Sequence, residues 1–353
     1  MFTPVGILGT GSWVPARAVS NEEIARRVPG ADPEWIVRRT AIRSRRFAAP
    51  GEATSDLAVR AAERALACAG LGPERIDYLI VATSTPDHPQ PPTSCLVQDR
   101  IGAYGAACFD VNAVCAGFVH ALVVARSLVA DRPGSHALVI GADVYSRILD
   151  FGDRRTAVLF GDGAGAAVVG SVPPGRGVVE YELVSQGDAN DLLGVSAGGS
   201  RSPASAATVA DGGHHFRMNG RGVTELVLRA VPPMVDKLLA RAGVGTADVA
   251  HVVPHQANGV LLGELVRACG LTSARTHRTV AEVANVGSAS TPLTLDRASR
   301  AGHLRDGDLV LLMAFGGGMS LGACLIRWHR TGSGGEGDLP AGYGREGTGS
   351  SNS

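Results

Sequence analysis

The amino-acid sequence predicts an α/β fold with buried central strands, arranged as two similar halves. Apolar runs of strand character alternate with helical segments along the chain, as at residues 78–82, 137–140 and 309–313. This alternation is typical of sheets that helices cover on both faces. A helix followed by a strand recurs in outline around residue 250, which indicates a structural repeat.

The best-marked helix of the first half is expected between Ser55 and Gly70. Ser55 is a good N-cap, Asp56 suits the positive end of the helix dipole, and Gly70 is suited to end the helix. The side chains expected to form its buried stripe are Leu57, Ala61, Ala65 and Cys68. A strand should follow at Tyr78.

The second half repeats this order. A helical stretch over residues 223–241 leads through Ala242 and Gly243 to an apolar strand over residues 249–253. The Pro173-Pro174-Gly175 segment indicates the junction, so we expect one half at residues 1–172 and the other at 173–330. Residues 331–353 are rich in glycine and serine and poor in apolar side chains, which predicts a disordered, dispensable tail.

Composition and charge exclude several classes of protein. The 353 residues are 45% apolar, and 33 basic side chains balance 33 acidic ones. Nothing global therefore attracts a nucleic acid or a membrane surface. The sequence contains neither a secretory leader pattern nor a run of about eighteen uncharged apolar residues, so a soluble, cytoplasmic protein is expected.

Six cysteines show no paired spacing typical of a metal site, and a chain of this size needs no disulfide. We therefore expect neither disulfides nor a bound metal. Five of the cysteines are best interpreted as small buried residues. Cys115 differs because it lies between a short extended segment and the helical run 119–129.

The position of Cys115 suits a nucleophile. A thiol at a helix N-terminus faces unpaired N–H groups and the positive end of the helix dipole, which favours the thiolate. Ala116 and Gly117 leave room for an incoming thioester. Taken alone, this pattern is still more often a buried structural cysteine.

Two further polar residues follow apolar strands or precede helices. His255 comes directly after Val252-Val253-Pro254, at the end of a strand where open α/β sheets place reactive groups, although it could also cap the next helix. Asn285 lies in a polar loop before the helical segment 292–300. An asparagine in such a loop is usually a turn former or a cap.

Two glycine-rich segments complete the pattern. Gly316-Gly317-Gly318 follows the strand at 309–313, where the backbone can aim an N–H group at a developing oxyanion; the alternative is a tight hairpin turn. The segment Phe160 to Gly165 superficially suggests a phosphate loop. It has neither the spacing of a dinucleotide fingerprint nor a Walker lysine, so close packing of strand backbone is the better interpretation.

These five elements occur in the order found in the ketoacyl synthase III family, which the sequence resembles over about residues 4–328. The matching segments are Cys115-Ala116-Gly117-Phe118, Phe160-Gly161-Asp162-Gly163-Ala164-Gly165, Pro254-His255-Gln256-Ala257-Asn258, Asn285, Phe315-Gly316-Gly317-Gly318 and residues 34–43. The resemblance implies the thiolase fold, with two similar halves, a mixed sheet in each and layers in the order αβαβα. It also implies a homodimer with a site in the middle of each subunit.

The family's mechanism is carried over residue by residue. Cys115 would take an acyl group from acyl-CoA, with the oxyanion held by the backbone N–H groups of Cys115 and Gly317. His255 and Asn285 would hydrogen-bond a malonyl thioester and stabilise the enolate that loss of carbon dioxide produces. The resemblance assigns no cofactor other than acyl-CoA as a substrate.

The resemblance also places coenzyme A. Its adenine would stack between Trp35 and Arg154, and Arg39 is suited to meet phosphate oxygens. The neighbouring arginines have an alternative role as a solvated basic face, which we expect at least for Arg45 and Arg46.

Several positions depart from the family pattern. Val260 and Glu225 stand where fatty-acid members carry basic residues that dock an acidic carrier protein, so docking should be weakened or redirected. Gln90 replaces an aromatic residue that would reach the partner's acyl pocket, which is consistent with an acyl group other than acetyl. Val286-Gly287 follows Asn285 in place of Thr-Ser, which affects the expected pose of Asn285.

Three functions are consistent with the sequence. The first is an acyltransferase of the ketosynthase type that condenses an acyl group with a malonyl thioester, in fatty acid or, more in keeping with the departures, secondary-metabolite (polyketide-type) biosynthesis. The second is transfer of the acyl group to a hydroxyl or amine of a small-molecule acceptor, without decarboxylation. The third, a non-catalytic partner subunit, is disfavoured by the complete set of Cys115, His255, Asn285 and Gly317.

Overall fold

Two five-stranded mixed sheets form the framework of the computed structural model, which describes residues 3–330. The predicted tail at 331–353 lies outside the described residues. The first sheet has the order β1-β7-β6-β4-β5, with bounds β1 Val5–Trp13, β4 Tyr78–Ala82, β5 Ala107–Val111, β6 Ala137–Val144 and β7 Asp162–Ser171. The second has the order β12-β11-β13-β14-β8, with bounds β8 Gly177–Ser185, β11 His251–Pro254, β12 Arg275–Thr276, β13 Leu309–Gly316 and β14 Ser320–Arg327.

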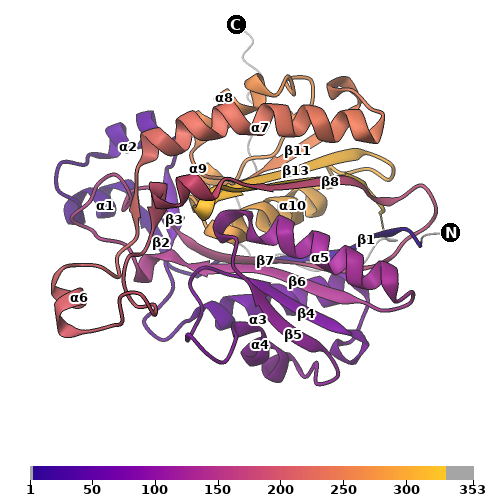
Figure 1. Cartoon of the computed structure of the whole chain (residues 1–353), viewed down its shortest axis with the longest axis horizontal. Coiled ribbons are helices and arrows are strands. Elements are labelled where there is room, and N and C mark those ends of the chain that lie inside the picture. Colours follow the sequence, from indigo (N-terminus) through magenta and orange to yellow (C-terminus); the bar gives the residue numbers. More distant parts are fainter. Residues whose placement is uncertain (1–2, 331–353) are drawn as a thin grey trace, which may run out of the picture.

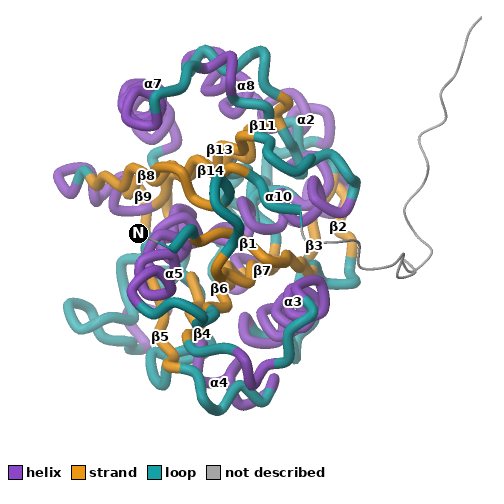
Figure 2. The backbone as a smooth tube through the Cα atoms, turned by 90° about the vertical axis from the view of Figure 1, so that its right-hand side faces the viewer, coloured by secondary structure: helices purple, strands orange, loops and turns teal. Residues whose placement is uncertain are grey.

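Helices cover both sheets and fill the space between them, which gives five layers (Figure 1). The middle layer holds α5 Gly117–Asp131 and α10 Ser290–Arg300. The outer layers hold α3 Thr54–Ala69 and α4 Thr93–Ile101 on the first sheet, and α7 Gly220–Ala242 and α8 Gly259–Ala268 on the second. The view turned by 90° shows the same stacking (Figure 2). The predicted α/β class and αβαβα layering are confirmed.

Smaller elements lie at one end of these layers. The remaining helices are α1 Asn21–Arg27, α2 Pro33–Thr40, α6 Ala206–Ala210 and α9 Val280–Val283. Two two-stranded sheets pair β2 Ala18–Ser20 with β3 Ser44–Arg46 and β9 Leu193–Gly194 with β10 Arg217–Met218. In Figure 1, α1, α2, β2 and β3 gather on the left side of the molecule, and α6 projects below them.

The predicted helix of the first half is α3, with two corrections. It begins at Thr54 after Ala53, and Ser55 lies in its first turn, where its N–H and hydroxyl groups both donate to Asp87. Gly70 ends the helix at φ +65°, as predicted. Cys68 is exposed, and Leu66 is buried instead, because the buried stripe follows the spacing 58, 62, 66 as well as 57, 61, 65.

The helix–strand pair of the second half is α7 followed by β11. Gly243 ends α7 in the left-handed conformation, as its position predicts. The strand begins at His251 rather than at Val249. The reason is a short 3-10 turn over Thr246–Asp248, in which the Asp248 carboxylate accepts a hydrogen bond from the Gly245 N–H group. This turn moves the start of the strand toward the C-terminus.

Arg45 contradicts the expected solvated basic face. Its side chain on β3 is completely buried, and burial lowers the pKa of its guanidinium to about 10. Arg46, the next residue, is half-exposed and donates to the carbonyl of Ala16. The alternation is that of a strand with one face turned to the interior.

One described helical stretch, Val114–Asp131, is long and apolar enough to cross a membrane by length and composition alone. In the fold, 56% of it is buried, because α5 lies between the two sheets. A buried core helix passes the same test of length and composition.

Candidate active site

Cys115 lies in a 3-10 turn, Val114–Ala116, that runs directly into α5. Its side chain is only 8% exposed. Burial, with the nearby charge of Asp143, raises the pKa of the thiol to about 12, although a hydrogen bond from Tyr145 acts in the opposite direction. The thiolate predicted from the helix N-terminus is therefore not the resting form, because desolvation of the charge outweighs it.

His255 follows β11 immediately, at the predicted end of the strand. Its backbone N–H group donates to the Met313 carbonyl at 2.7 Å, and its ring meets the Phe315 ring edge-on at 5.2 Å between centroids. Burial lowers the pKa of His255 to about 3, so the imidazole is neutral near pH 7. The expected alternative, a cap of the next helix, is wrong, because Asn258 caps α8 through the Val260 N–H group.

Asn285 is held by its backbone. Its N–H group donates to the Leu159 carbonyl at 3.0 Å, and its carbonyl accepts from the Gly161 N–H group at 2.9 Å. Its side-chain Oδ1 accepts from the Gly287 N–H group at 2.9 Å, which leaves the amide nitrogen to donate to a ligand.

Gly287 explains why Asn285 is followed by an unusual pair of residues. Gly287 has φ +58°, and a Cβ there would lie 2.3 Å from Oδ2 of Asp143. No larger residue fits this backbone without moving Asp143. The departure from the family pattern is thus compatible with a fixed pose of Asn285.

Gly316 ends β13, Gly317 and Gly318 lie in the turn of the β13–β14 hairpin, and this segment packs against the turn that holds Cys115. A Cβ on Gly316 would lie 2.7 Å from the Cys115 backbone nitrogen, and one on Gly317 would lie 2.8 Å from Val114 Cγ2. Only Gly318 has a positive φ, +67°. The hairpin turn is confirmed, the oxyanion role stays a prediction, and close approach explains Gly316 and Gly317 better than conformational freedom does.

These segments meet at one place. The turn of Cys115 contacts the glycine hairpin and the 3-10 turn Gly287–Ala289 that follows Asn285, and Phe315 links the hairpin to His255. Among the described residues, the non-glycine residues with positive φ are Ala41, Val114, Ala284 and Met319. Three of them adjoin Cys115, Asn285 or the glycine turn, and backbone strain of this kind clusters at functional sites.

The sequence interpretation missed a polar network beneath Cys115. The buried Asp143 carboxylate accepts hydrogen bonds from the N–H groups of Ser84 and Ser288, at 2.9 and 2.8 Å. The Tyr145 hydroxyl lies 3.0 Å from the Ser84 hydroxyl. The available signal was an acidic residue, Asp143, three residues beyond the apolar run 137–140 and inside strand β6.

The segment at Phe160 to Gly165 is confirmed as close-packed backbone. A Cβ on Gly165 would lie 2.4 Å from the Leu293 nitrogen, and one on Gly161 would lie 2.6 Å from the Val283 carbonyl oxygen. Strand β7 thus packs directly on α10.

The predicted coenzyme A residues lie on and beside α2. The Arg154 guanidinium lies 5.2 Å from the Trp35 ring centroid and donates to the Gly30 carbonyl at 2.7 Å. Arg39 is exposed, and its carbonyl accepts from the Asn258 side chain at 3.2 Å. The end of α2 therefore contacts the start of α8, close in the chain to His255.

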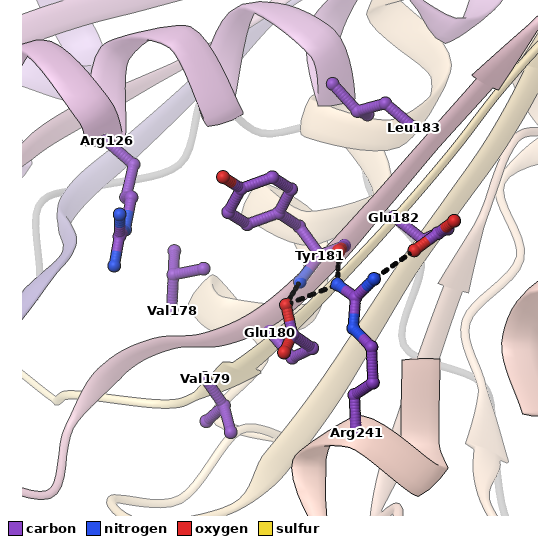
Figure 3. A pocket seen from close by; sticks show the side chains of 8 residues that line it. All are labelled: Arg126, Val178, Val179, Glu180, Tyr181, Glu182, Leu183 and Arg241. Atoms are coloured by element: carbon purple, nitrogen blue, oxygen red, sulfur yellow. Dashed lines mark hydrogen bonds and ion pairs between the residues drawn. The ribbon is translucent and has the colours of Figure 1, made fainter. Parts of the chain in front are cut away.

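Two open surface cavities lie away from Cys115, His255 and Asn285. One, of about 530 Å³, lies between α5, β8 and α7 (Figure 3), and its lining residues are Arg126, Val178, Val179, Glu180, Tyr181, Glu182, Leu183 and Arg241. Arg241 is already paired there with Glu180 and Glu182. The other, of about 570 Å³, lies beside α1 and α2. Neither is lined by Cys115, His255 or Asn285, so geometry and chemistry, rather than cavity size, indicate the site.

Comparison with known proteins agrees with this geometry. Residues 109–187 match the family model of 3-oxoacyl-[acyl-carrier-protein] synthase III, and residues 239–328 match the model of its C-terminal part. Acetoacetyl CoA synthase NphT7 from Streptomyces sp. (strain CL190) is 50% identical over 324 residues, 91% of this chain and 98% of the relative. Beta-ketoacyl-[acyl-carrier-protein] synthase III of Symbiobacterium thermophilum is 44% identical over 93% of this chain and 99% of its own.

Solved structures show the same fold. The synthase III of Aquifex aeolicus VF5 superposes with a TM-score of 0.84 at 34% identity, over 92% of this chain and 100% of that one. The priming beta-ketosynthase of the R1128 polyketide pathway gives 0.85 at 36% identity, over 92% and 96%. The chain is therefore a condensing enzyme of the thiolase fold. It belongs to the 3-oxoacyl-[acyl-carrier-protein] synthase III family.

Proposed function

We propose that this enzyme condenses a short acyl group from acyl-CoA with the two-carbon unit of malonyl-CoA. Cys115 attacks the acyl thioester carbonyl, and the backbone N–H groups of Cys115 and Gly317 hold the oxyanion. Coenzyme A leaves with the thiol proton, and the acyl group remains on the sulfur. Stacking of Trp35 and Arg154 on the adenine, with Arg39 at the phosphates, would hold the nucleotide during this step.

In the second half-reaction, the carbon–carbon bond to the malonyl carboxylate breaks and carbon dioxide leaves. Neutral His255 and the amide nitrogen of Asn285 donate to the thioester oxygen, where the enolate charge develops. The carbanion attacks the acyl carbon on Cys115, the carbon–sulfur bond breaks, and the thiolate regains a proton. The product is a β-ketoacyl thioester on the carrier that delivered malonate.

A short acyl group is supported by an aromatic cluster that reaches Cys115 through Tyr145. Tyr145 hydrogen-bonds the Cys115 thiol. Its ring stacks on Phe160 with 4.4 Å between centroids, and Phe216 meets both rings edge-on. All three rings are almost completely buried. A wall of this kind leaves little room for a long chain without repacking.

Coenzyme A, rather than a carrier protein, is supported as the malonyl carrier by the charges at the rim, and this observation carries the proposal. Val260 is 43% exposed and neutral, and Glu225 pairs with Arg221 at 2.8 Å. Arg217 is likewise paired, with Asp150. The two positions where a carrier-docking cation is expected therefore offer none to an acidic carrier. The name of the relative that is 50% identical, acetoacetyl CoA synthase, also describes a product on coenzyme A.

We further propose a homodimer in the cytoplasm. Within residues 3–330, strand β5 ends the first sheet without a further strand beside it, and its residues from Cys108 to Val111 are half-exposed. An open apolar strand edge of this kind is suited to pairing with a second copy. No cofactor is proposed beyond acyl-CoA as a substrate.

The test is a competition between carriers. Enzyme acylated with acetyl-CoA is offered equal amounts of malonyl-CoA and malonyl-carrier protein, and mass spectrometry identifies where the β-ketoacyl product lies. We expect acetoacetyl-CoA to dominate. Product on the carrier protein alone would contradict the choice of carrier, and acyl transfer to an added alcohol or amine without release of carbon dioxide would favour simple acyl transfer instead.

A further inference from the structure

We infer that Arg45 is a positioning residue for Asn285. Its buried side chain fixes residues 158–161, the segment that pairs with the backbone of Asn285. This inference rests on the proposed role of Asn285 in decarboxylation, and it adds a residue that lies outside the predicted set of Cys115, His255 and Asn285.

The guanidinium of Arg45 makes two directed hydrogen bonds in the interior. One nitrogen donates to the Asn21 side-chain oxygen at 2.7 Å, and the other donates to the Val158 carbonyl at 2.8 Å. Asn21 is itself anchored, because its amide group donates to the Ile42 carbonyl at 2.8 Å. The planar guanidinium of Arg45 thus connects the β2–β3 region rigidly to Val158.

Residues 158–161 transmit this anchor to Asn285. The Leu159 carbonyl accepts a hydrogen bond from the Asn285 N–H group, and the Gly161 N–H group donates to the Asn285 carbonyl. These two bonds hold the backbone of Asn285 on both sides of its Cα. The space beside Gly161 is filled, since a Cβ there would lie 3.1 Å from Arg45 Cβ and 2.6 Å from the Val283 carbonyl oxygen. The segment therefore has no room to shift independently of Arg45.

Strand β3 and Arg43, the residue before it, also hold the chain that leads into Asn285. The N–H group of Arg43 donates to the Ala281 carbonyl at 2.8 Å, and the Ser44 hydroxyl donates to the Glu282 carbonyl at 2.9 Å. These carbonyls belong to α9, which ends just before the strained residue Ala284. This part of the chain thus fixes Asn285 in two ways. It holds α9, the helix that precedes Asn285, and through Arg45 it holds residues 158–161, which pair with Asn285.

The use of an arginine for this contact needs a reason, because burying a cation is costly. Among residues 3–330, no carboxylate lies within 4.0 Å of Arg45, and its Nε has no hydrogen-bond partner. An apolar side chain would avoid that cost, but it would leave the Asn21 and Val158 oxygens unbonded and the segment untethered. A lysine would keep the charge and lose the fork, since its ammonium is a point donor.

The test separates the two half-reactions in the full-length enzyme. Arg45→Met and Arg45→Lys are compared with Arg46→Met. The Arg46 variant removes a cation from the same strand, but this cation makes its hydrogen bond at the surface. Acylation of Cys115 by acetyl-CoA and release of carbon dioxide from malonyl-CoA are measured on the same preparations. We expect both Arg45 variants to acylate within about threefold of wild type but to release carbon dioxide about 10²-fold more slowly, as misplacement of a catalytic group predicts. Arg46→Met should match wild type in both.

Asn21→Ala provides a second route to the same contact if Arg45→Met fails to fold. It removes one anchor of the guanidinium and should slow decarboxylation while sparing acylation. In an Asn285→Ala background, the Arg45 substitution should add less than about twofold, because the group that it positions is gone. Equal loss of both half-reactions, or independent, multiplicative effects of Arg45 and Asn285, would overturn the inference. If Asn285→Ala itself decarboxylates like wild type, the proposed function fails instead.

Discussion

The interior of the proposed site and its rim are built differently. Cys115, His255 and Asn285 are 8%, 2% and 5% exposed. Their neighbouring backbone is fixed by strand ends, close glycine contacts and paired hydrogen bonds. At the rim, Arg39 and Val260 are exposed, and Glu225 makes an ion pair at the surface.

This difference separates chemistry from the choice of carrier. Interior groups are positioned by many packed contacts, so a single substitution should remove a reaction step. Rim charges act through solvent, are screened by salt and mainly change the rate of association. The carrier can therefore change through a few surface substitutions while the reaction stays the same.

The largest effect is expected from Cys115→Ala. Without the sulfur there is no acyl-enzyme, and turnover should fall by at least about 10⁴-fold. Peptide mapping after incubation with acetyl-CoA checks the assignment. Acyl label on another cysteine, or equal labelling of wild type and variant, would show that the nucleophile is elsewhere.

His255→Ala and Asn285→Ala should leave acylation of Cys115 largely intact and slow the malonyl-dependent step by about 10²- to 10³-fold, the typical effect of losing a donor to a developing oxyanion. Release of carbon dioxide from malonyl-CoA is the readout. Unchanged release in both variants would remove these residues from the interior machinery. Asn258→Ala, which alters the cap of α8 beside His255, serves as a structural control.

The protonation state of Cys115 tests whether burial dominates the interior. Because burial raises the pKa of the thiol to about 12 and the thiolate is the reactive form, alkylation of Cys115 should accelerate nearly tenfold per pH unit from pH 7 to 10. Iodoacetamide labelling of Cys115, followed by peptide mapping, measures this slope. A plateau near pH 7 would instead show that the helix N-terminus stabilises the thiolate, as the sequence alone predicts.

The smallest effect is expected at the rim. Val260→Arg with Glu225→Lys should speed capture of an acidic carrier protein several-fold at low salt, with the gain shrinking as salt rises. Ala67→Arg with Glu74→Lys makes the same change in charge on the first sheet's side of the molecule. Fast, salt-sensitive binding already present in wild type would mean that other rim cations, such as Arg267, dock the carrier.

Much of the fold was accessible from the sequence, because hydrophobic period and glycine positions are local signals. The ends of α3 and α7 at Gly70 and Gly243 are examples. The fate of Arg45 was not accessible, since nothing in a run of arginines shows which one a strand turns inward. The elements that bury Cys115 were likewise not accessible, because the second sheet and the glycine hairpin that cover it come from distant parts of the chain.

The catalytic roles of Cys115, His255 and Asn285 remain predictions. They were assigned from the order in which the family's motifs occur along the chain. Asp143 was missed because its partners, Ser84 and Ser288, come from loops about 60 and 145 residues away. Such long-range networks leave no periodic trace in one sequence. An acidic residue inside a buried strand is the local signal worth following in related chains.

The most direct test of the central claim is a single-turnover experiment with acetylated enzyme and malonyl-CoA labelled in its free carboxyl carbon. Labelled carbon dioxide, acetoacetyl-CoA and loss of the acetyl group from Cys115 are measured over the same time course. We expect one labelled carbon dioxide and one acetoacetyl-CoA to form for each acetyl group lost from Cys115. Loss of the acetyl group without labelled carbon dioxide would contradict decarboxylative condensation as the reaction of this site.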